Sequence, residues 1–274
     1  MTTAASVVPT FPQSAVAKKA LTGSATFWFI TAVIGQWTFL YYIIAFYGAS
    51  IVQGNFQSWS RNKFLFKGYV PGDTIGNLYF AAHVLLAAVI TFGGALQLMP
   101  QIRARAISVH RWNGRLFLLT AGAASIAGLW LVWVRRSNPT LDGAIAVSGN
   151  ALLIIIFAAL AWRSALLRDI PTHRRWALRA YIAANGVWFE RVGLFAWIIV
   201  NRGQVGLHMF FRFWEFGCYL LPLAVLELYL RTKDGSDRRA QFAMAACLVI
   251  LTVLMGIGIF GVAMFGWLPL LAKA

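Results

Sequence analysis

Charged side chains are scarce in this chain of 274 residues: Asp, Glu, Lys and Arg together make up 12%, and only 8 residues are acidic. A soluble domain carries about 25% charged residues, because polar groups have to cover its water-facing surface. Apolar residues account for 60% of this sequence. The balance excludes a soluble enzyme fold and a disordered protein, and it predicts an integral membrane protein.

Cysteine is almost absent too. The two cysteines, Cys218 and Cys247, lie in separate apolar stretches, which excludes a disulfide-stapled secreted domain and a CxxC metal or redox motif. No CxxCH is present, so covalent attachment of a c-type haem is excluded as well. The sequence also lacks P-loop, zinc-protease and nucleophile-elbow motifs, so no common enzyme signature competes with the membrane interpretation.

The few charges are strongly one-sided, with 24 Lys and Arg against 8 acidic residues and a net charge of +16. Such an excess is also typical of nucleic-acid binders, but here the cations form short clusters between apolar stretches, without the aromatic and basic stripe of a single-strand binder. Clusters of this kind orient membrane helices, since cytoplasmic loops collect Lys and Arg. We therefore expect the lipid bilayer as a partner and no nucleic acid.

Seven stretches are long and apolar enough for membrane helices, which need about 20 residues to cross the hydrocarbon. Open strands are excluded, because lipid offers no partner to unpaired backbone groups. The sequence thus predicts an all-α, polytopic bundle of about seven transmembrane helices in a single domain over 25–270, preceded by a disordered tail over 1–24. The expected helices cover residues 26–51, 76–99, 113–134, 145–165, 176–200, 205–230 and 241–268.

The basic residues between these helices indicate their direction. Fifteen cations fall on one side, which places the N-terminus in the cytoplasm of a bacterial inner membrane and the long connection 53–77 outside. Aromatic residues of this connection are expected at the membrane surface: Trp59, Phe64, Phe66 and Tyr69. The inner cations are Lys18, Lys19, Arg103, Arg105, Arg111, Arg115, Arg163, Arg168, Arg174, Arg175, Arg179, Arg231, Lys233, Arg238 and Arg239. The seven outer cations are Arg61, Lys63, Lys67, Arg135, Arg136, Arg202 and Lys273.

The chain has 4 histidines, and the expected threading places them at two depths. His83 and His208 fall in the outer halves of the second and sixth helices, whereas His110 and His173 open the third and fifth helices at the cytoplasmic face. The two sets are about 20 Å apart at 1.5 Å per residue, so they can act only as two pairs on parallel helices. Facing histidines in two such layers are typical of proteins that hold b-type haem.

This layout predicts one or two haem b groups, with the four histidines as iron ligands. Neighbouring arginines would pair with the haem propionates, namely Arg111 and Arg174 at the inner level and Arg212 at the outer level. For His110 and His173 an alternative stays open, since polar side chains at helix ends also anchor a helix to lipid headgroups.

The segments around His110 and His173 are similar to each other in sequence. His110-Arg111-Trp112 with Arg115 opens the third helix, and His173-Arg174-Arg175-Trp176 with Arg179 opens the fifth. Both segments follow an inward-running helix and a basic loop, but the second is one residue out of step, so the match is compatible with a duplicated helix pair and too short to establish one.

Four charged residues lie inside the expected fifth and sixth helices: Glu190, Arg191, Arg212 and Glu215. A charge at mid-membrane costs at least about 2.5–3.5 kcal/mol, so such groups are retained for pairing or for function. His208, Arg212 and Glu215 share one helix face at the spacing i, i+4, i+7. We expect an outward-facing polar chamber in which Glu190, Glu215 and Arg191 are the catalytic groups, handling protons, a quinone head or an anionic substrate. The alternative is a structural ion-pair network between the two helices.

One block of the chain resembles a known family. Over roughly residues 25–230 it is similar to a widespread bacterial family of multi-pass membrane proteins catalogued as a domain of unknown function. The resemblance implies a helical membrane bundle and favours His83, His110 and the arginines as family features, without implying an activity. The matching residues are Gly68-Tyr69-Val70-Pro71-Gly72-Asp73, Gly76-Asn77, His83, Gly93-Gly94, Leu96-Gln97, Pro100, Arg103, Arg105 and His110-Arg111-Trp112-Asn113-Gly114-Arg115.

In layout alone, the chain is also similar to membrane cytochromes whose two b haems are held by four helix histidines. It departs from them in having seven helices, one of them between the two histidine-bearing pairs. The leading interpretation is a b-type haem protein, a membrane oxidoreductase that carries electrons between a reductant and a quinone or other acceptor. The first alternative is a haem-free transporter or lipid-binding protein that uses the Glu/Arg cluster, and the second is an accessory subunit of a larger membrane complex.

Overall fold

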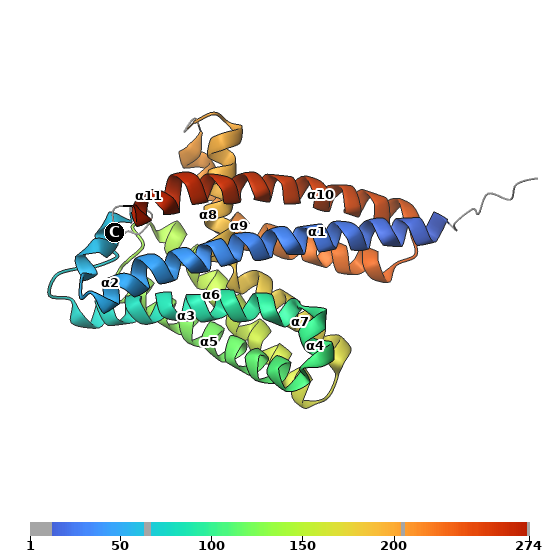
Figure 1. The fold of residues 1–274 in the computed structure, drawn as a ribbon, viewed down its shortest axis with the longest axis horizontal. Helices are drawn as coiled ribbons and strands as arrows, with labels where there is room; N and C mark the ends of the chain where they lie inside the picture. Colours follow the sequence, from blue (N-terminus) through green and yellow to red (C-terminus); the bar gives the residue numbers. More distant parts are fainter. Residues whose placement is uncertain (1–12, 63–66, 204–205, 273–274) are drawn as a thin grey trace, which may run out of the picture.

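The computed structural model of the chain describes residues 13–62, 67–203 and 206–272 (Figure 1). These residues are mostly helical and none of them forms a strand, which confirms the all-α class. The elements in chain order are α1 (Gln13–Tyr42), a π-helical turn (Ile43–Gly48), α2 (Ala49–Val52), a 3-10 helix (Phe56–Arg61), α3 (Thr74–Leu98), α4 (Pro100–Arg105), α5 (Ile107–Trp133), α6 (Leu141–Leu166), α7 (Ile170–Ala184), α8 (Gly186–Val200), α9 (Leu207–Asp234), α10 (Arg238–Gly261), a second π-helical turn (Val262–Trp267) and α11 (Leu268–Leu271).

Six helical segments are long and apolar enough to span a membrane, or seven if α7 and α8 count as one bent span. They expose large apolar side chains outward, for example Ile34, Ile126 and Ile250 at 60%, 62% and 61% exposure. Soluble proteins rarely expose contiguous apolar surface on this scale, whereas lipid tails cover it. The chain is a multi-pass membrane protein.

The expected disordered tail over 1–24 is wrong in its second half. α1 begins at Gln13, and Leu21 in its third turn is buried against Met244 and Leu248 of α10. This apolar contact explains why the segment is helical, because burial stabilises a helix that composition alone would not. Outside the described residues lie 1–12, Lys63, Phe64, Phe66 and Lys273.

The expected fifth helix, 176–200, is two helices. α7 and α8 meet at Asn185, and their axes differ by 54°. Asn185 is buried, and its Nδ2 donates to the Tyr181 backbone oxygen at 2.8 Å. Asn competes with a helix for backbone hydrogen bonds, and Gly186 after it adds backbone freedom, so the interruption has a local cause.

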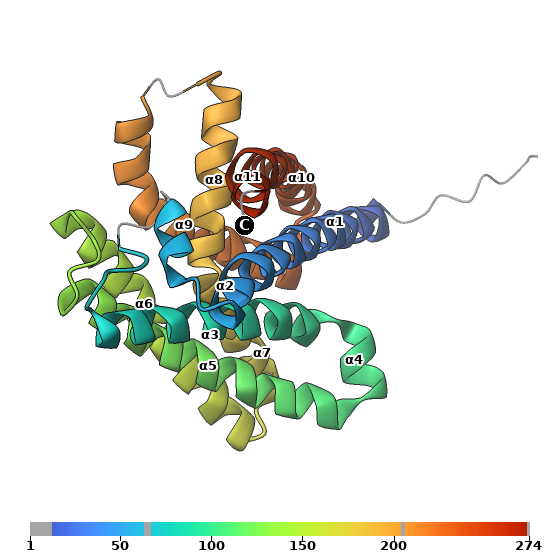
Figure 2. The same ribbon diagram turned by 60° about the vertical axis from the view of Figure 1, so that its left-hand side comes forward.

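Three helix pairs form the body of the bundle: α1 with α10, α3 with α5, and α6 with α7. Both views show α1 alongside α10, with α3 and α5 below them (Figures 1 and 2). α8 meets α10 at Gly258, where a Cβ atom would lie 2.1 Å from the Val192 backbone oxygen. Small residues permit such close contacts between membrane helices.

α8 and the first turns of α9 form a hairpin on the α10 side of this body. In both views the hairpin rises away from α3 and α5 (Figures 1 and 2). The bend at Asn185 sets the direction of α8, and α9 contains Pro222, which removes one backbone hydrogen bond from the helix. The hairpin therefore carries the beginning of α9 away from α3.

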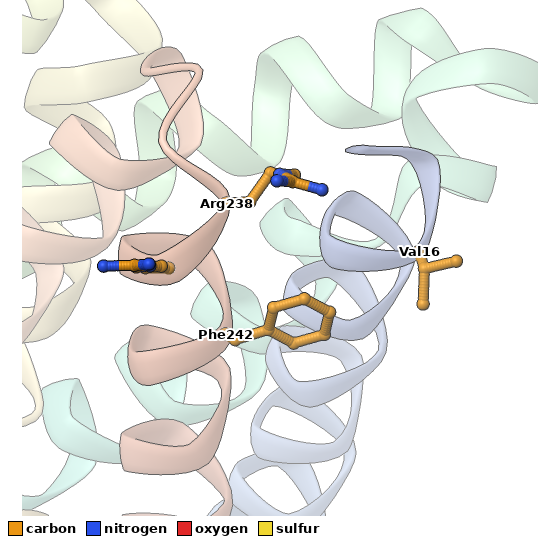
Figure 3. A pocket seen from close by; sticks show the side chains of 4 residues that line it. Val16, Arg238 and Phe242 are labelled. Atoms are coloured by element: carbon orange, nitrogen blue, oxygen red, sulfur yellow. The ribbon is translucent and has the colours of Figure 1, made fainter. Parts of the chain in front are cut away.

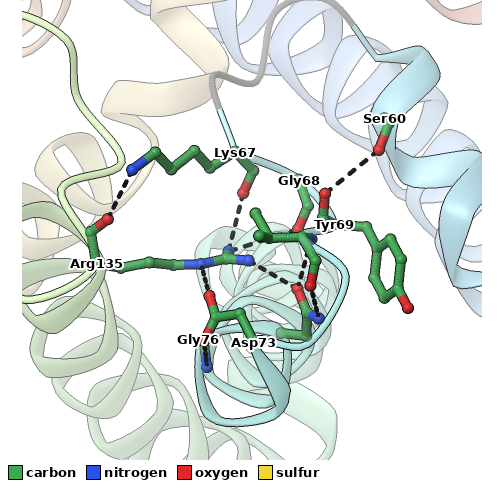
Figure 4. A network of polar contacts seen from close by, with 9 residues as sticks. Ser60, Lys67, Gly68, Tyr69, Asp73, Gly76 and Arg135 are labelled. Atoms are coloured by element: carbon green, nitrogen blue, oxygen red, sulfur yellow. Dashed lines mark hydrogen bonds and ion pairs between the residues drawn. The ribbon is translucent and has the colours of Figure 1, made fainter.

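The connection between α2 and α3 closes the outer end around one buried arginine (Figure 4). Arg135, whose side chain is 4% exposed, donates from Nε to Asp73 Oδ2 at 2.8 Å and from Nη2 to Asn77 Oδ1 at 2.7 Å. Its Nη1 donates to the Lys67 backbone oxygen at 2.9 Å, while Lys67 Nζ donates to the Arg135 backbone oxygen at 3.1 Å. These bonds fasten the loop to the start of α3 and the end of α5.

The aromatic residues of this connection do not all lie at the membrane surface. Trp59 is 1% exposed, and its ring lies 6.1 Å from Tyr47 and 5.3 Å from Phe80, measured between ring centres. The expectation for Trp59 is wrong because the loop folds back over the π-helical turn, where the indole joins the apolar core. Tyr69 is half-buried.

Candidate functional site

The two histidines near the helix starts occupy the same position in their helices. His110 is the fourth residue of α5 and His173 is the fourth residue of α7. His173 Nδ1 is 2.9 Å from the Ala161 backbone oxygen on α6; a carbonyl only accepts, so Nδ1 carries the proton and Nε2 has the free lone pair of the neutral ring. The two rings interact electrostatically. Nδ1 of His110 is buried without a hydrogen-bond partner among the described residues.

The sequence similarity between these two helix starts has a structural counterpart. In α5 the Arg115 guanidinium lies 4.9 Å from the Trp112 ring centre, and in α7 the Arg179 guanidinium lies 4.5 Å from the Trp176 ring centre. In each helix the arginine follows its tryptophan by three residues, and the two side chains form a cation–π pair. Both histidine-bearing helices thus carry a cation–π pair in their second turn, but the pair is one residue further from the histidine in α7 than in α5.

The arginines around the inner histidines differ in their surroundings. Arg179 Nε and Nη2 donate to the two carboxylate oxygens of Glu227 on α9, at 2.6 and 2.8 Å. Arg111 and Arg174, which follow the two histidines directly, are exposed. Their charges are therefore available at the inner face of the molecule.

The outer histidines are not brought to one level. His83 is the tenth residue of α3, and its Nδ1 is 2.9 Å from the Ala124 backbone oxygen on α5. His208 is exposed and is the second residue of α9, on the α8–α9 hairpin. Measured from the two helix starts, the difference of eight residues corresponds to about 12 Å of depth.

The four intramembrane charges have separate environments. Arg212 Nη2 donates to Asp142 Oδ2 at 2.9 Å, and both side chains are more than half exposed. Glu190 Oε2 lies 3.7 Å from Arg191 Nη1. Glu215 is half-buried on α9 and interacts electrostatically with Glu190. The structure thus brings Glu190 near both Arg191 and Glu215, and it places Arg212 at the surface.

Arg191 is the most enclosed of these charges, with 15% of its side chain exposed. Its Nη1 donates to the Val187 backbone oxygen at 2.9 Å, and its guanidinium lies 5.8 Å from the Phe39 ring centre. It also interacts electrostatically with Tyr42 and Tyr47. A guanidinium has five N–H donors, and 3.7 Å is too long for a hydrogen bond to the neighbouring carboxylate. Arg191 can therefore still bind an acceptor.

Comparison with known protein families identifies the family of this chain. Residues 80–230, more than half of its length, match the family described as "predicted membrane protein (DUF2306)". The chain belongs to this family. No curated protein and no solved structure matches it significantly.

The part of this DUF2306 protein that matches the family runs from within α3 to within α9. It contains all four histidines and the charged residues Glu190, Arg191, Arg212 and Glu215, whereas α1 and α10 lie outside it. Among the described residues, no three His, Cys, Asp or Glu side chains are grouped closely enough to hold a metal ion together. Any ligation by these histidines would therefore be in pairs.

Sequence reasoning missed a buried polar cluster at the outer end of the first helix. Asn62 Nδ2 donates to the hydroxyl oxygens of Tyr42 and Tyr47 at 3.0 and 2.8 Å. The π-helical turn brings the two tyrosines, five residues apart, to one face of the helix. π-helical turns often occur at functional sites, but the apolar run that contains this one reads as a regular helix, so no signal in the sequence marks the cluster.

Proposed function

We propose that this DUF2306 protein binds one haem b between His110 and His173, and that it carries electrons between a reductant and a quinone or another acceptor. One observation carries the proposal: His110 and His173 are each the fourth residue of their helix, in α5 and α7, and the His173 ring is oriented by the Ala161 backbone oxygen. Paired imidazoles from two helices are the usual ligands of haem b in membrane electron carriers.

The chemistry of the two rings fits an iron ligand. Ligating histidines usually donate the N–H of their second ring nitrogen to a carbonyl, which fixes the tautomer and the ring orientation. The contact of His173 Nδ1 with the Ala161 oxygen is of this kind and leaves Nε2 for a metal. A buried ring nitrogen without a partner, as in His110, costs about 1–3 kcal/mol, so a group that engages this ring would be stabilised.

The exposed arginines suit the acidic edge of the same group. Arg111 and Arg174 are adjacent in sequence to the two histidines and would pair with the haem propionates. A bound haem supplies reversible one-electron chemistry, while the residues of this chain would hold it, orient it and exclude water. A position near one face of the bilayer suits exchange with a quinone or with a soluble donor on that side.

We propose no second haem between His83 and His208. Their difference in depth of about 12 Å and the direction of the α8–α9 hairpin, which carries His208 away from α3, do not support two rings on one iron. The His83 contact with α5 and the exposure of His208 are both explained without a ligand. The proposal is therefore a single haem on one side of the membrane.

The distribution of basic residues supports a cytoplasmic location for this side. Among the described residues, fifteen cations lie at or near the end where α5, α7 and α10 begin and five lie near the opposite end. Cytoplasmic loops collect Lys and Arg. We therefore propose a bacterial inner membrane with the N-terminus and the haem on the cytoplasmic side.

A visible spectrum tests the haem proposal. The full chain, purified in detergent from haem-supplied cells, should show a six-coordinate b-type spectrum that sharpens with dithionite. His110→Ala and His173→Ala should each abolish this spectrum, whereas His208→Ala, which removes an exposed histidine, should retain it. A colourless protein with a helical circular dichroism spectrum would overturn the proposal, and so would equal loss in the His208 variant.

A haem-free binding or transport function is the second candidate, and the broken helix favours it. Transporters place discontinuous helices at binding sites near the middle of the membrane, and the break at Asn185 precedes Glu190 and Arg191 by less than two turns. The buried guanidinium would bind a quinone carbonyl or an anionic group. Arg191→Gln should weaken binding of a water-soluble ubiquinone analogue, while the surface change Arg212→Gln should not. Wild-type affinity in the Arg191 variant would exclude this role.

A further inference from the structure

A groove at the inner end of the bundle lies between the first turns of α1 and α10, apart from the histidines and from the charges of α8 (Figure 3). Its volume is about 270 Å³, and it is lined by Val16, Arg238, Arg239 and Phe242. The groove can take part of a chain-like molecule, but not a whole lipid.

The walls of the groove combine two chemistries. Val16 and Phe242 are large apolar side chains that are 46% and 45% exposed, and Figure 3 shows the Phe242 ring directed toward α1 with Arg238 above it. Phe242 follows Arg238 by four residues, so it lies on the same helix face about 6 Å deeper. The headgroup layer on each side of a bilayer is about 5–7 Å thick. A guanidinium among the headgroups therefore places this ring at the edge of the hydrocarbon.

The mouth of the groove is strongly cationic. Arg238 and Arg239 begin α10, and Lys18 and Lys19 are exposed in the second turn of α1. The nearest acidic residue in sequence, Asp237, serves as the N-cap of α10, where its side chain accepts from the Arg239 backbone N–H at 2.9 Å. Two cations, Arg238 and Arg239, thus line the groove, and two more lie in the adjoining turn of α1.

We propose that this groove binds an anionic phospholipid, with the phosphate at the arginines that line it, Arg238 and Arg239, and one acyl chain against Val16 and Phe242. A soluble anion would use the cations and leave the apolar walls uncovered. A zwitterionic lipid would cover the walls but bring its own positive charge to a cationic mouth. An anionic lipid satisfies both parts of the groove, and it is the ligand that basic clusters at membrane helix ends attract.

Native mass spectrometry of the full chain tests this proposal, with dioleoyl phosphatidylglycerol as the anionic lipid and dioleoyl phosphatidylcholine as the zwitterionic one. One cation near an anionic surface changes binding about five-fold, so Arg238→Gln with Arg239→Gln should lower the preference for phosphatidylglycerol by up to about thirty-fold. The matched control, Arg103→Gln with Arg105→Gln, removes two exposed cations of α4 at the same face and should keep the preference.

A separate substitution tests the apolar wall of the groove. Phe242→Ala should reduce retention of both lipids and leave their ratio unchanged, because it removes a chain contact and no charge. Equal loss of preference in the α4 control would reduce the effect to general attraction and overturn the proposal. So would unchanged retention in Phe242→Ala, or displacement of the lipid by millimolar inorganic phosphate. Melting temperatures in phosphatidylcholine establish that each variant is folded.

Discussion

The Arg135 guanidinium and the Asp73 carboxylate join the end of α5 to the start of α3 across 62 residues of sequence. Asp73 serves both partners: its Oδ2 accepts from Arg135 Nε at 2.8 Å, and its Oδ1 accepts from the Gly76 backbone N–H at 2.9 Å as the N-cap of α3. One carboxylate therefore caps a helix and fixes that helix to its neighbour. The pairing of α3 with α5, which carry His83 and His110, depends on this contact at its outer end.

Replacing Arg135 by Gln should destabilise the bundle. The Arg135 side chain is buried and donates to Asn77 and to the Lys67 backbone oxygen, and leaving such acceptors without their donor costs about 1–3 kcal/mol. This corresponds to a fall in melting temperature of at least about 2 °C, measured by circular dichroism in detergent. Arg136→Gln changes the exposed neighbour and should leave the melting temperature within about 1 °C. Similar melting of the two variants would show that the pair contributes little.

The same carboxylate predicts a dependence on pH. The pKa of Asp73 lies below its ordinary value of 3.8, first because the Gly76 N–H and then because Arg135 stabilise the ionised form. A lowered folded-state pKa contributes stability above the unfolded value, and this contribution is lost as the pH falls through the folded value. The melting temperature should therefore be steady from about pH 7 to pH 5 and fall below about pH 4.

Asp73→Asn separates this contribution from that of the other acids. The variant should melt at a lower temperature than the wild type near neutral pH, and the difference between the two should shrink below about pH 4. Asp142→Asn alters an exposed carboxylate that pairs with Arg212 at the surface, and its difference should be small at every pH. A constant gap between the Asp73 variant and the wild type would contradict the linkage.

Apolar runs predict the spans well, because lipid requires unbroken hydrogen-bonded helices wherever the backbone crosses it. The helix expected over 145–165 is α6, Leu141–Leu166. The break at Asn185 is invisible to the same reasoning, since the segments on both sides of it fit one helix of transmembrane length. The start of α1 at Gln13 is hidden for a different reason: the contact of Leu21 with α10 is between residues far apart in sequence.

The candidate site also has features that the sequence predicts and features that it does not. The positions of His110 and His173 near the starts of α5 and α7 could be predicted, because basic loops and apolar runs mark where these helices begin. The position of His208 depends on the direction of the α8–α9 hairpin, which is set by a bend that the sequence does not reveal. The sequence also does not predict which charged side chains pair, because no spacing rule relates Arg212 to Asp142, 70 residues away.

The contact of α8 with α10 predicts a sharp difference between two glycines of one helix. A Cβ at Gly258 would lie 2.1 Å from the Val192 backbone oxygen, whereas a Cβ at Gly256 would have no atom within 4 Å. Gly258→Ala should therefore separate the helices and cost about 1–3 kcal/mol. Gly256→Ala should be neutral or slightly stabilising, since Ala favours a helix over Gly. Thermal melts of the two variants measure the contrast, and equal melting would contradict this close approach.

The buried pair Gln36 and Tyr181 predicts a coupling between α1 and α7. Gln36 Nε2 donates to the Tyr181 hydroxyl at 2.7 Å, and this hydroxyl donates back to Gln36 Oε1 at 2.9 Å. Either Tyr181→Phe or Gln36→Leu leaves a buried polar group unpaired, at about 1–3 kcal/mol. The double variant replaces both partners by apolar groups and should cost less than the sum, with a coupling of about 0.5–3 kcal/mol.

The free energy of unfolding of the wild type, the two single variants and the double variant is measured in denaturant. Tyr41→Phe is the control, because Tyr41 is 63% exposed and should tolerate the change. Strict additivity would mean that the two side chains act independently. A coupling would show that a polar contact deep in the bundle holds the first helix against α7, just before the break at Asn185. The direction of α8, and with it the surroundings of Arg191, would then depend on a hydrogen bond made one turn earlier.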